Sequence, residues 1–271
     1  MTPDVKRLID FYKSPLGKIA RALVRDVVIR FAGNLRGQRV LGLGFATPYL
    51  RFALEPAERV IAFMPARQGA SAWPREGPSH TVLCDPLEMP LTDSAIDVIV
   101  AVHAFEHATD AEELMRELWR VAAPNARLVI VVPRRSGLWA RFDNTPFGDG
   151  HPFSRSQLER LLRDHSFIPE HWGEALYLPP VPQRWVLKWA RLFERIGRPT
   201  GGMFAGVMCV VARKELFPAL PRRKRIERFV QLAVGKFTCA RKNAIRCQFV
   251  RQSSQTLSGL CAALWPGLRW Q

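Results

Sequence analysis

The sequence has 271 residues, of which 48% are hydrophobic, which is enough for one α/β domain with additions or for two small domains. Its net charge of +16 is unevenly spread: residues 1–217 hold 29 basic and 23 acidic residues, whereas residues 218–271 hold 11 basic residues and one acidic residue. The excess of positive charge therefore belongs mainly to the tail and does not make the whole chain a nucleic-acid-binding protein. We expect the tail, residues 218–271, to be a basic, disordered extension, with contact to nucleic acid or anionic lipid as the alternative.

The five cysteines are an odd number without any CxxC pair, which argues against a disulfide framework. The first ten residues carry charges without an apolar run behind them, so they do not resemble a secretory signal. No stretch reaches the roughly 18 uncharged apolar residues that a membrane-spanning helix needs. These observations predict a cytoplasmic protein, and they leave its oligomeric state open.

The first 33 residues form a helical segment, because apolar side chains recur at steps of three and four. Pro15 predicts a break in it after Ser14. Seven short apolar runs then predict strands, five of which alternate with helices or loops up to residue 132. The predicted strands are 39–43, 60–63, 81–84, 97–102, 127–132, 167–172 and 204–213. This order predicts a Rossmann-like, seven-stranded and mostly parallel sheet with an antiparallel edge and helices on both faces.

Three helix starts are indicated between these strands. Thr47 followed by Pro48 predicts one helix, and Thr109 with Glu112 has the spacing of a capping box for a second. Ser154 with Gln157 is a capping box for a third. We expect all three helices to cover the sheet.

The turn after the first strand reads Gly-Leu-Gly-Phe-Ala from Gly42 to Ala46. In a parallel sheet, ligands bind beyond the carboxyl ends of the strands, where the winding direction reverses. Small residues at Gly42, Gly44 and Ala46 would let a ligand approach the backbone there. Glycines after a strand also serve as ordinary turns, so this motif alone decides nothing.

Several further segments, taken together in order, resemble the class I S-adenosylmethionine-dependent methyltransferases. The turn at 40–48 is similar to the first motif of that family, and Leu83 to Leu91 is similar to its third-strand segment. Residues 97–107 resemble the fourth-strand motif, in which an apolar-Glu-His triplet ends the following loop, and residues 114–133 and 151–167 resemble the later motifs. The resemblance spans about residues 36–213, and it implies a methyltransferase-like domain at 34–217.

The resemblance implies S-adenosylmethionine as the cofactor and assigns residues to its cleft. The acid after the third strand, Asp85, would reach the adenine amino group. The residues implied at the cofactor are Gly42, Gly44, Phe45, Ala46, Met64, Asp85, Pro86 and His103.

The sequence departs from the family at two positions that usually carry an acid. One such acid binds the amino group of the cofactor, and here its position is Gly42; the other binds the ribose hydroxyls, and here it falls on Met64. Each lost charge-assisted hydrogen bond is worth about 1.5–3 kcal/mol, so cofactor binding would weaken by roughly ten- to a hundredfold per position. These losses favour the alternative of a catalytically inactive binding or interaction protein with a methyltransferase fold.

His103, Glu106 and His107 lie where a catalytic base could sit, although Glu106 and His107 could equally stabilise the loop after the fourth strand. The same residues spell His-x-x-Glu-His, the inverted zinc-peptidase motif. Two histidines spaced in this way share a metal when they lie on a helix, whereas here they follow a strand directly. We therefore expect no metal site.

Residues 184–196 form an amphipathic segment with basic residues on one side and an apolar face made of Trp185, Trp189, Leu192, Phe193 and Ile196. Its simplest interpretation is a helix packed onto the domain, and a lid, a partner surface or a membrane-surface helix are alternatives. The leading hypothesis for the whole chain is methyl transfer from S-adenosylmethionine to an undetermined small-molecule or lipid-like acceptor.

Overall fold

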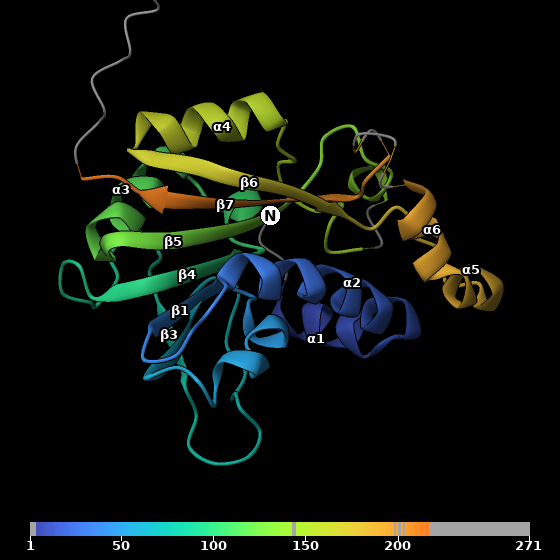
Figure 1. Ribbon diagram of the computed structural model, residues 1–271. Coiled ribbons are helices and arrows are strands. Elements are labelled where there is room, and N and C mark those ends of the chain that lie inside the picture. Colours follow the sequence, from blue (N-terminus) through green and yellow to red (C-terminus); the bar gives the residue numbers. More distant parts are fainter. Residues whose placement is uncertain (1–3, 143–144, 198, 200–201, 203, 217–271) are drawn as a thin grey trace, which may run out of the picture. The chain divides into compact units, whose positions relative to one another are not determined.

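The computed structural model describes residues 4–142, 145–197, 199, 202 and 204–216. The seven predicted strands pair into one sheet in the order β3-β2-β1-β4-β5-β7-β6 (Figure 1). Strands β1 to β5 run parallel, and β7 runs antiparallel to both β5 and β6. The predicted fold class is confirmed. The strands are β1 Arg39–Gly44, β2 Arg59–Pro65, β3 Thr81–Cys84, β4 Ile96–Val102, β5 Ala122–Pro133, β6 Phe167–Ala175 and β7 Val207–Lys214.

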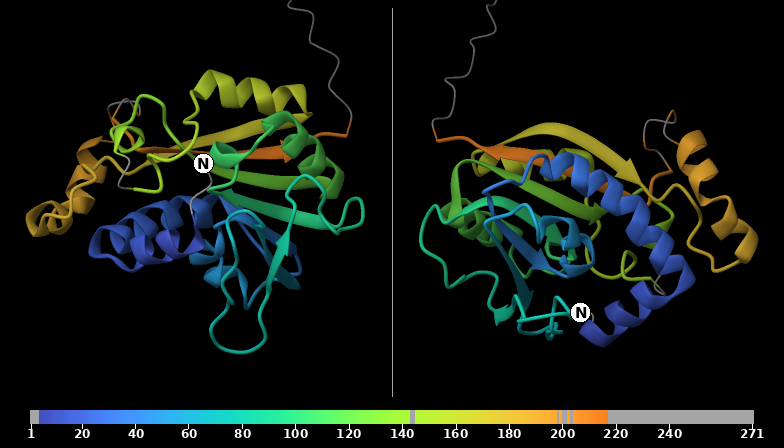
Figure 2. Two further views of the ribbon diagram at one scale, coloured as in Figure 1. Left: turned by 180° about the vertical axis from the view of Figure 1, so that it is seen from behind. Right: turned by 60° about the horizontal axis from the view of Figure 1, so that its bottom comes forward.

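Side chains of the central strands alternate between two apolar cores, one on each face of the sheet. The first core contains Val40, Val98 and Val129 together with helices α1 (Val5–Lys13) and α2 (Pro15–Ala32). The second contains Leu41 and Ile99 with helices α3 (Ala111–Val121) and α4 (Arg155–Asp164) (Figure 2). Because burying one such side chain contributes about 1.5–3 kcal/mol, both faces of the central strands stabilise the fold.

Ser14 separates the first two helices, as predicted. Its backbone N–H donates to the carbonyl oxygen of Asp10 at the end of α1, and its hydroxyl accepts from the N–H of Gly17 at 3.0 Å in the first turn of α2. Pro15 takes the first position of α2, where a missing N–H costs nothing. The two helices therefore meet at a joint of one residue, Ser14.

The predicted capping box at Ser154 is confirmed, with the Ser154 hydroxyl and the Gln157 side chain bonded to each other's backbone N–H groups. The one at Thr109 is wrong by one residue. Asp110 begins α3 instead, because its Oδ1 accepts from the N–H groups of both Glu112 and Glu113 at 2.8 and 3.0 Å. The Thr109 side chain is thereby left beside a pocket.

Two other predicted helices are shorter than expected. After Thr47 the chain makes only two 3₁₀ turns, because Glu55 precedes Pro56 and that position disfavours helical geometry. The segment 184–196 is interrupted at Trp189. The short elements are η1 Thr47–Tyr49, η2 Arg51–Ala53, η3 Phe105–His107, η4 Trp139–Arg141, α5 Arg184–Lys188 and α6 Ala190–Gly197. Within the described ranges, none of the helices has the length and apolar character that crossing a membrane requires.

The turn after β1 is held tightly against the end of β4. Gly44 has a left-handed backbone (φ 75°), and a Cβ on it would overlap the carbonyl oxygen of Val102 and lie 2.8 Å from that of His103. Phe45 donates its N–H to the Val102 carbonyl oxygen at 2.8 Å. Only glycine fits this position, because both the backbone angle and the close approach exclude a side chain.

We expect Gly44→Ala to lower the free energy of unfolding by about 2–4 kcal/mol, since it combines a left-handed alanine with an overlap against backbone atoms. Urea denaturation measures this loss. Gly37→Ala is the matched control, because Gly37 also has a left-handed backbone (φ 67°) but nothing within 4 Å of a new Cβ. It should cost only about 1 kcal/mol. Equal losses in the two variants would show that the contact with β4 is unimportant.

The starts of β1 and β4 are joined by an ion pair. Oδ2 of Asp97 accepts hydrogen bonds from the backbone N–H and the Nε–H of Arg39, both at 2.9 Å. Oδ1 of Asp97 accepts from Nη2 of Arg39 at 3.0 Å. The hydrogen bonds from the Arg39 side chain lower the pKa of Asp97 below its ordinary value. The two side chains are 38% and 23% exposed, so solvent screens part of this attraction.

Because the pKa of Asp97 is lower in the folded state than in the unfolded chain, its contribution is present above the unfolded pKa of about 3.9 and disappears as the pH falls through the folded pKa. We expect Asp97→Asn to cost about 1–2 kcal/mol at pH 7 and progressively less below pH ~4. Urea denaturation at several pH values tests this. Asp164→Asn, at an exposed carboxylate that ends α4, should change little at any pH. A loss at Asp97 that stays constant with pH would refute the assignment.

Candidate functional site

The candidate site lies beyond the carboxyl ends of β1 and β4. In the sheet, β2 lies on the outer side of β1 and β5 lies on the outer side of β4, so the chain winds in opposite directions from β1 and from β4. A parallel sheet has a crevice between two such strands, at their carboxyl ends. The loops that follow β1, β2, β3 and β4 all begin at this edge. The site is therefore built from segments that are far apart in the sequence.

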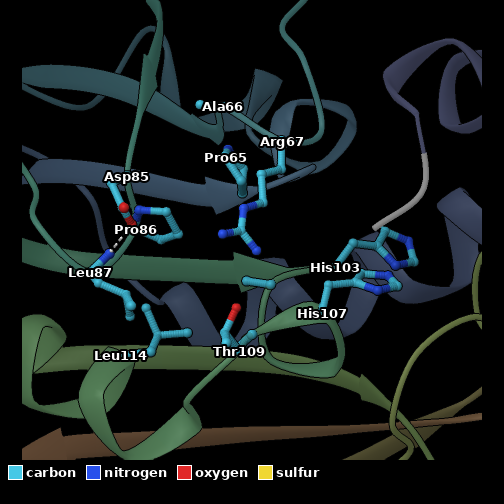
Figure 3. Close-up of a pocket in the computed structure, with 12 residues that line it drawn as sticks. Pro65, Ala66, Arg67, Asp85, Pro86, Leu87, His103, His107, Thr109 and Leu114 are labelled. Carbon is cyan, nitrogen blue, oxygen red and sulfur yellow. Dashed lines mark hydrogen bonds between the residues drawn. The ribbon is translucent and has the colours of Figure 1, made fainter. Parts of the chain in front are cut away.

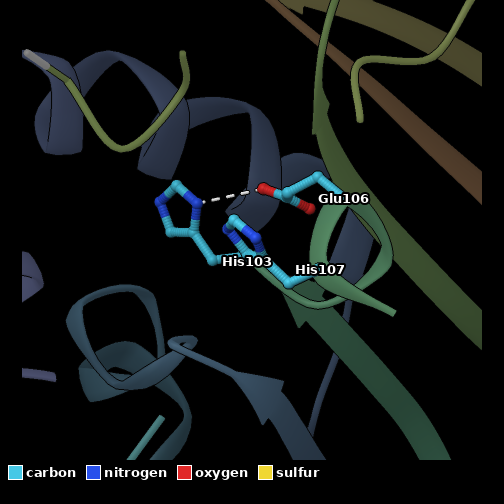
Figure 4. Close-up of side chains that lie close together, drawn as sticks. All are labelled: His103, Glu106 and His107. Carbon is cyan, nitrogen blue, oxygen red and sulfur yellow. Dashed lines mark hydrogen bonds and ion pairs between the residues drawn. The ribbon is translucent and has the colours of Figure 1, made fainter. Parts of the chain in front are cut away.

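A buried chain of hydrogen bonds links Tyr49, Tyr12, His103 and Glu106, and Figure 4 shows its last bond, between His103 and Glu106. The phenol oxygen of Tyr12, on α1, lies 2.8 Å from the phenol oxygen of Tyr49 and 2.8 Å from Nε2 of His103. Nδ1 of His103 lies 3.0 Å from Oε1 of Glu106. The side chains of His103 and Glu106 are 0% and 1% exposed, so water does not compete for these bonds.

The direction of these bonds follows from the carboxylate. Glu106 accepts, so Nδ1–H of His103 donates to it, and in the neutral ring Nε2 then accepts from the Tyr12 hydroxyl. The Tyr12 oxygen is left to accept from Tyr49. Burial is the main cause that raises the pKa of Tyr12, with Tyr49 second, and burial also raises the pKa of Tyr49. Both phenols therefore stay protonated.

Aromatic rings pack around this chain and fill the part of the crevice nearest β1. Phe45 stacks on Tyr12 with ring centroids 5.6 Å apart, and the ring of Phe147 lies 4.8 Å from that of His103. Phe45, Tyr49 and Phe147 are all buried. A ligand that entered this part of the crevice would have to displace Tyr12.

The other part of the crevice is an open pocket of about 200 Å³ (Figure 3). Asp85 stands at one side of it, with Oδ1 accepting from the Leu87 N–H at 2.9 Å, and Arg67 extends toward its middle from the loop after β2. Apolar groups supply most of the remaining wall. The lining residues come from the loops after β2, β3 and β4: Pro65, Ala66, Arg67, Asp85, Pro86, Leu87, His103, Ala104, His107, Ala108, Thr109 and Leu114.

A second, more polar pocket of about 380 Å³ borders the first at His107. Arg67 and Thr109 line both pockets, and His151 lines the second. Neither ring nitrogen of His107 has a hydrogen-bond partner among the described residues. Burial lowers the pKa of His107, so its ring is neutral at pH 7 and able to accept a proton. Gly150 lets the chain lie against this ring, because a Cβ there would meet it at 2.9 Å.

His103, Glu106 and His107 offer ligand atoms that lie within 4.8 Å of one another. Both ring nitrogens of His103 are already engaged, one with Tyr12 and the other with Glu106. Arg67 also lines the two pockets that border His107, and its positive charge opposes a cation there. We therefore describe the cluster as a hydrogen-bonded group and derive no metal chemistry from it.

The structure separates the predicted cofactor residues into two sets. Asp85, Pro86 and His103 line the open pocket. The others are buried beside it, and Gly42 leaves space for Leu50, which a Cβ there would overlap. This buried set is Gly42, Gly44, Phe45, Ala46 and Met64.

Sequence reasoning missed Tyr12, Arg67 and Thr109 as parts of the site. Tyr12 lies in the predicted N-terminal helical segment, and its contact with His103 spans 91 positions of the chain. Arg67 follows β2 by two residues, so its place after a parallel strand was a signal that could have identified it. Thr109 was assigned to a helix cap that Asp110 provides instead.

Comparisons with known proteins find methyltransferases among the similar proteins. A family model of the methyltransferase domain matches residues 40–130. Demethylmenaquinone methyltransferase of Thermus thermophilus is 28% identical over 150 residues, covering 54% of this chain and 60% of that protein. A probable tocopherol O-methyltransferase of rice is 30% identical over 142 residues, covering 51% of this chain and 38% of that protein. The chain thus spans less than two thirds of these relatives.

Solved structures share the fold at lower identity. A methyltransferase of Thermotoga maritima, described as a possible histamine N-methyltransferase, superposes with a TM-score of 0.56 at 13% identity, covering 78% of this chain and 96% of that one. Geranyl diphosphate C-methyltransferase of Streptomyces coelicolor gives a TM-score of 0.51 at 16% identity, covering 71% and 78%. Both support the sheet topology described above.

We expect Tyr12→Phe to lower the free energy of unfolding by about 1–3 kcal/mol, because it leaves Nε2 of His103 and the Tyr49 hydroxyl buried without a partner. Tyr49→Phe is the control. It removes only one bond and leaves the Tyr12–His103 bond in place, so its cost should be smaller. Urea denaturation measures the loss of unfolding free energy in each variant. A larger loss in Tyr49→Phe than in Tyr12→Phe would contradict this description of the hydrogen bonds.

Proposed function

We propose that this chain, in which residues 40–130 match a model of the methyltransferase domain, transfers a methyl group from S-adenosylmethionine to a small-molecule or lipid-like acceptor. The observation that carries the proposal is the open pocket at the carboxyl ends of β2, β3 and β4. Parallel sheets of this kind bind nucleotide-like ligands at that edge. The relatives named above support the reaction class and leave the acceptor open.

The open pocket fits the nucleoside end of S-adenosylmethionine. A flat base needs apolar walls and a few polar groups at its edge, and Pro65, Pro86 and Leu114 provide such walls. Asp85 would accept from the adenine amino group through the carboxylate oxygen that Leu87 does not use. Arg67 or Thr109 would bind the ribose side, where Met64 supplies no acid.

The remaining, methionine-bearing end of the cofactor belongs toward β1, where Tyr12 and Phe45 now lie. Binding of the whole cofactor would therefore require Tyr12 to leave its bond with His103. The joint at Ser14 gives α1 a place to hinge, because the helical hydrogen bonds are interrupted there. Departure of Tyr12 would also free Nε2 of His103 to face the ligand.

Bound S-adenosylmethionine supplies an electrophilic methyl group on a positively charged sulfur, and the tasks left to the protein are alignment and proton removal. We place the acceptor in the second pocket, next to His107. Burial keeps His107 uncharged at pH 7 by lowering its pKa, and its ring nitrogens have no partner among the described residues, so one of them would be free to accept a proton from an acceptor hydroxyl or amine. Glu106 would fix the orientation of His103 rather than touch the substrate.

The second candidate function is that of a binding or interaction protein that keeps the methyltransferase fold without catalysis. The filled part of the crevice around Tyr12 favours it, together with the absence of a carboxylate at Gly42 and Met64. Such a protein would bind a nucleoside in the open pocket, and it would make no favourable contacts with the methionine end of S-adenosylmethionine. The two functions therefore predict different relative affinities for S-adenosylmethionine and adenosine.

Isothermal titration with S-adenosylmethionine and with adenosine separates them. If Tyr12 moves aside, S-adenosylmethionine should bind at least tenfold more tightly than adenosine, because the additional part of the cofactor gains contacts worth at least about 1.4 kcal/mol. If the crevice stays closed, adenosine should bind as well or better. No heat with either ligand at millimolar concentration would contradict the assignment of the pocket.

Asp85→Asn should weaken binding of either ligand about tenfold to a hundredfold, as expected for a lost charge-assisted hydrogen bond. Glu88→Gln is the matched control, because Glu88 is an exposed acid three residues further on that does not line the pocket. Isothermal titration of both variants gives the ratio of their dissociation constants. Equal affinities in the two variants would show that Asp85 does not contact the ligand.

A further inference from the structure

An exposed apolar face runs along α5 and α6. Trp185, Trp189 and Ile196 are 63%, 53% and 63% exposed, and Leu192 is also exposed. We call these four residues the apolar face. Several exposed large apolar side chains within one short segment usually mark a place where something binds.

The opposite side of the same segment holds it to the domain. Val186, Ala190 and Glu194 are buried, and Glu194 Oε1 accepts from the backbone N–H of Tyr177 at 2.8 Å. The segment thus packs onto the domain, but through Val186 and Ala190 and not through Trp185 and Trp189. The segment is held by this buried side, and the side chains of the apolar face remain exposed.

Basic side chains flank the apolar face. Arg184, Lys188, Arg191 and Arg195 are all exposed, and none of them forms an ion pair among the residues that the structure describes. The only acid between residues 184 and 196 is Glu194, which is buried. The surface around the apolar face is therefore positive.

We infer that the apolar face and its basic rim bind the surface of an anionic lipid bilayer. Tryptophan and leucine side chains insert at the boundary between head groups and acyl chains, and each nearby arginine or lysine adds about 1 kcal/mol of attraction to anionic lipid. The segment lies in the interface plane and does not cross the membrane, because α6 has only eight residues.

The positive charge of the rim argues against two other occupants of the apolar face, which are a second copy of this chain and residues 218–271. A second copy of this chain carries +16 and would bring the same positive rim to the contact. Residues 218–271 carry 11 basic residues and one acid, so they too are repelled by the rim. An anionic bilayer matches both the apolar and the charged part of this surface. The inference is independent of the proposed function, since it uses no residue of the two pockets.

Flotation of the full chain with lipid vesicles tests the inference. Vesicles of phosphatidylcholine with about one third phosphatidylglycerol should bind the protein, and vesicles of pure phosphatidylcholine should bind at least tenfold less. The double variant Trp185→Ser/Trp189→Ser and the charge variant Arg191→Glu/Arg195→Glu should each weaken binding to the anionic vesicles by about tenfold or more. Circular dichroism verifies that each variant is folded.

Leu83→Ser is the matched control, because Leu83 is 53% exposed on the edge strand β3 and should leave vesicle binding unchanged. Because the 11 basic residues of the tail would add attraction to anionic lipid in every variant, insertion is read separately by quenching of tryptophan fluorescence with lipids brominated in their acyl chains. Quenching that is the same in the wild type and in Arg191→Glu/Arg195→Glu would overturn the inference. So would vesicle binding unaffected by the tryptophan variant, or a dimer in gel filtration that this variant abolishes.

Discussion

The hydrogen bond between Tyr12 and His103 determines how this site is built. It links the N-terminal helix to the residue that directly follows β4, and it lies in the crevice that the parallel sheet leaves between β1 and β4. Because both groups are buried, breaking the bond without a replacement partner is costly. The bond therefore closes the part of the crevice near β1 and leaves the nucleoside-sized pocket beside Asp85 open.

The fold could be predicted from the sequence because its strands are short apolar runs with turn residues between them. Both faces of the central strands are covered, so Val40 and Leu41 are both apolar although they point to opposite cores. The first residue of a helix was harder to predict, because neighbouring residues can compete for the N-cap position. Thr109 and Asp110 both suit an N-cap, and only the geometry showed that the carboxylate of Asp110 bonds two backbone N–H groups.

The site was only partly predictable. Asp85 and His103 could be placed because each follows a parallel strand directly, and the ends of such strands meet at one edge. Tyr12 could not, since its contact with His103 depends on how α1 docks, and no local pattern encodes that angle. Gly42 and Gly44 stay predictions as ligand contacts, and in the structure a side chain at either position would overlap neighbouring protein atoms.

The central claim is that ligand binding beside Asp85 exchanges the Tyr12–His103 bond for contacts to the rest of the cofactor. A crystal structure of the chain with S-adenosylhomocysteine tests it most directly. The account predicts the nucleoside between the ends of β2, β3 and β4, with the Tyr12 hydroxyl withdrawn from His103. A ligand bound elsewhere, or one fully seated in the crevice with that bond intact, would contradict it.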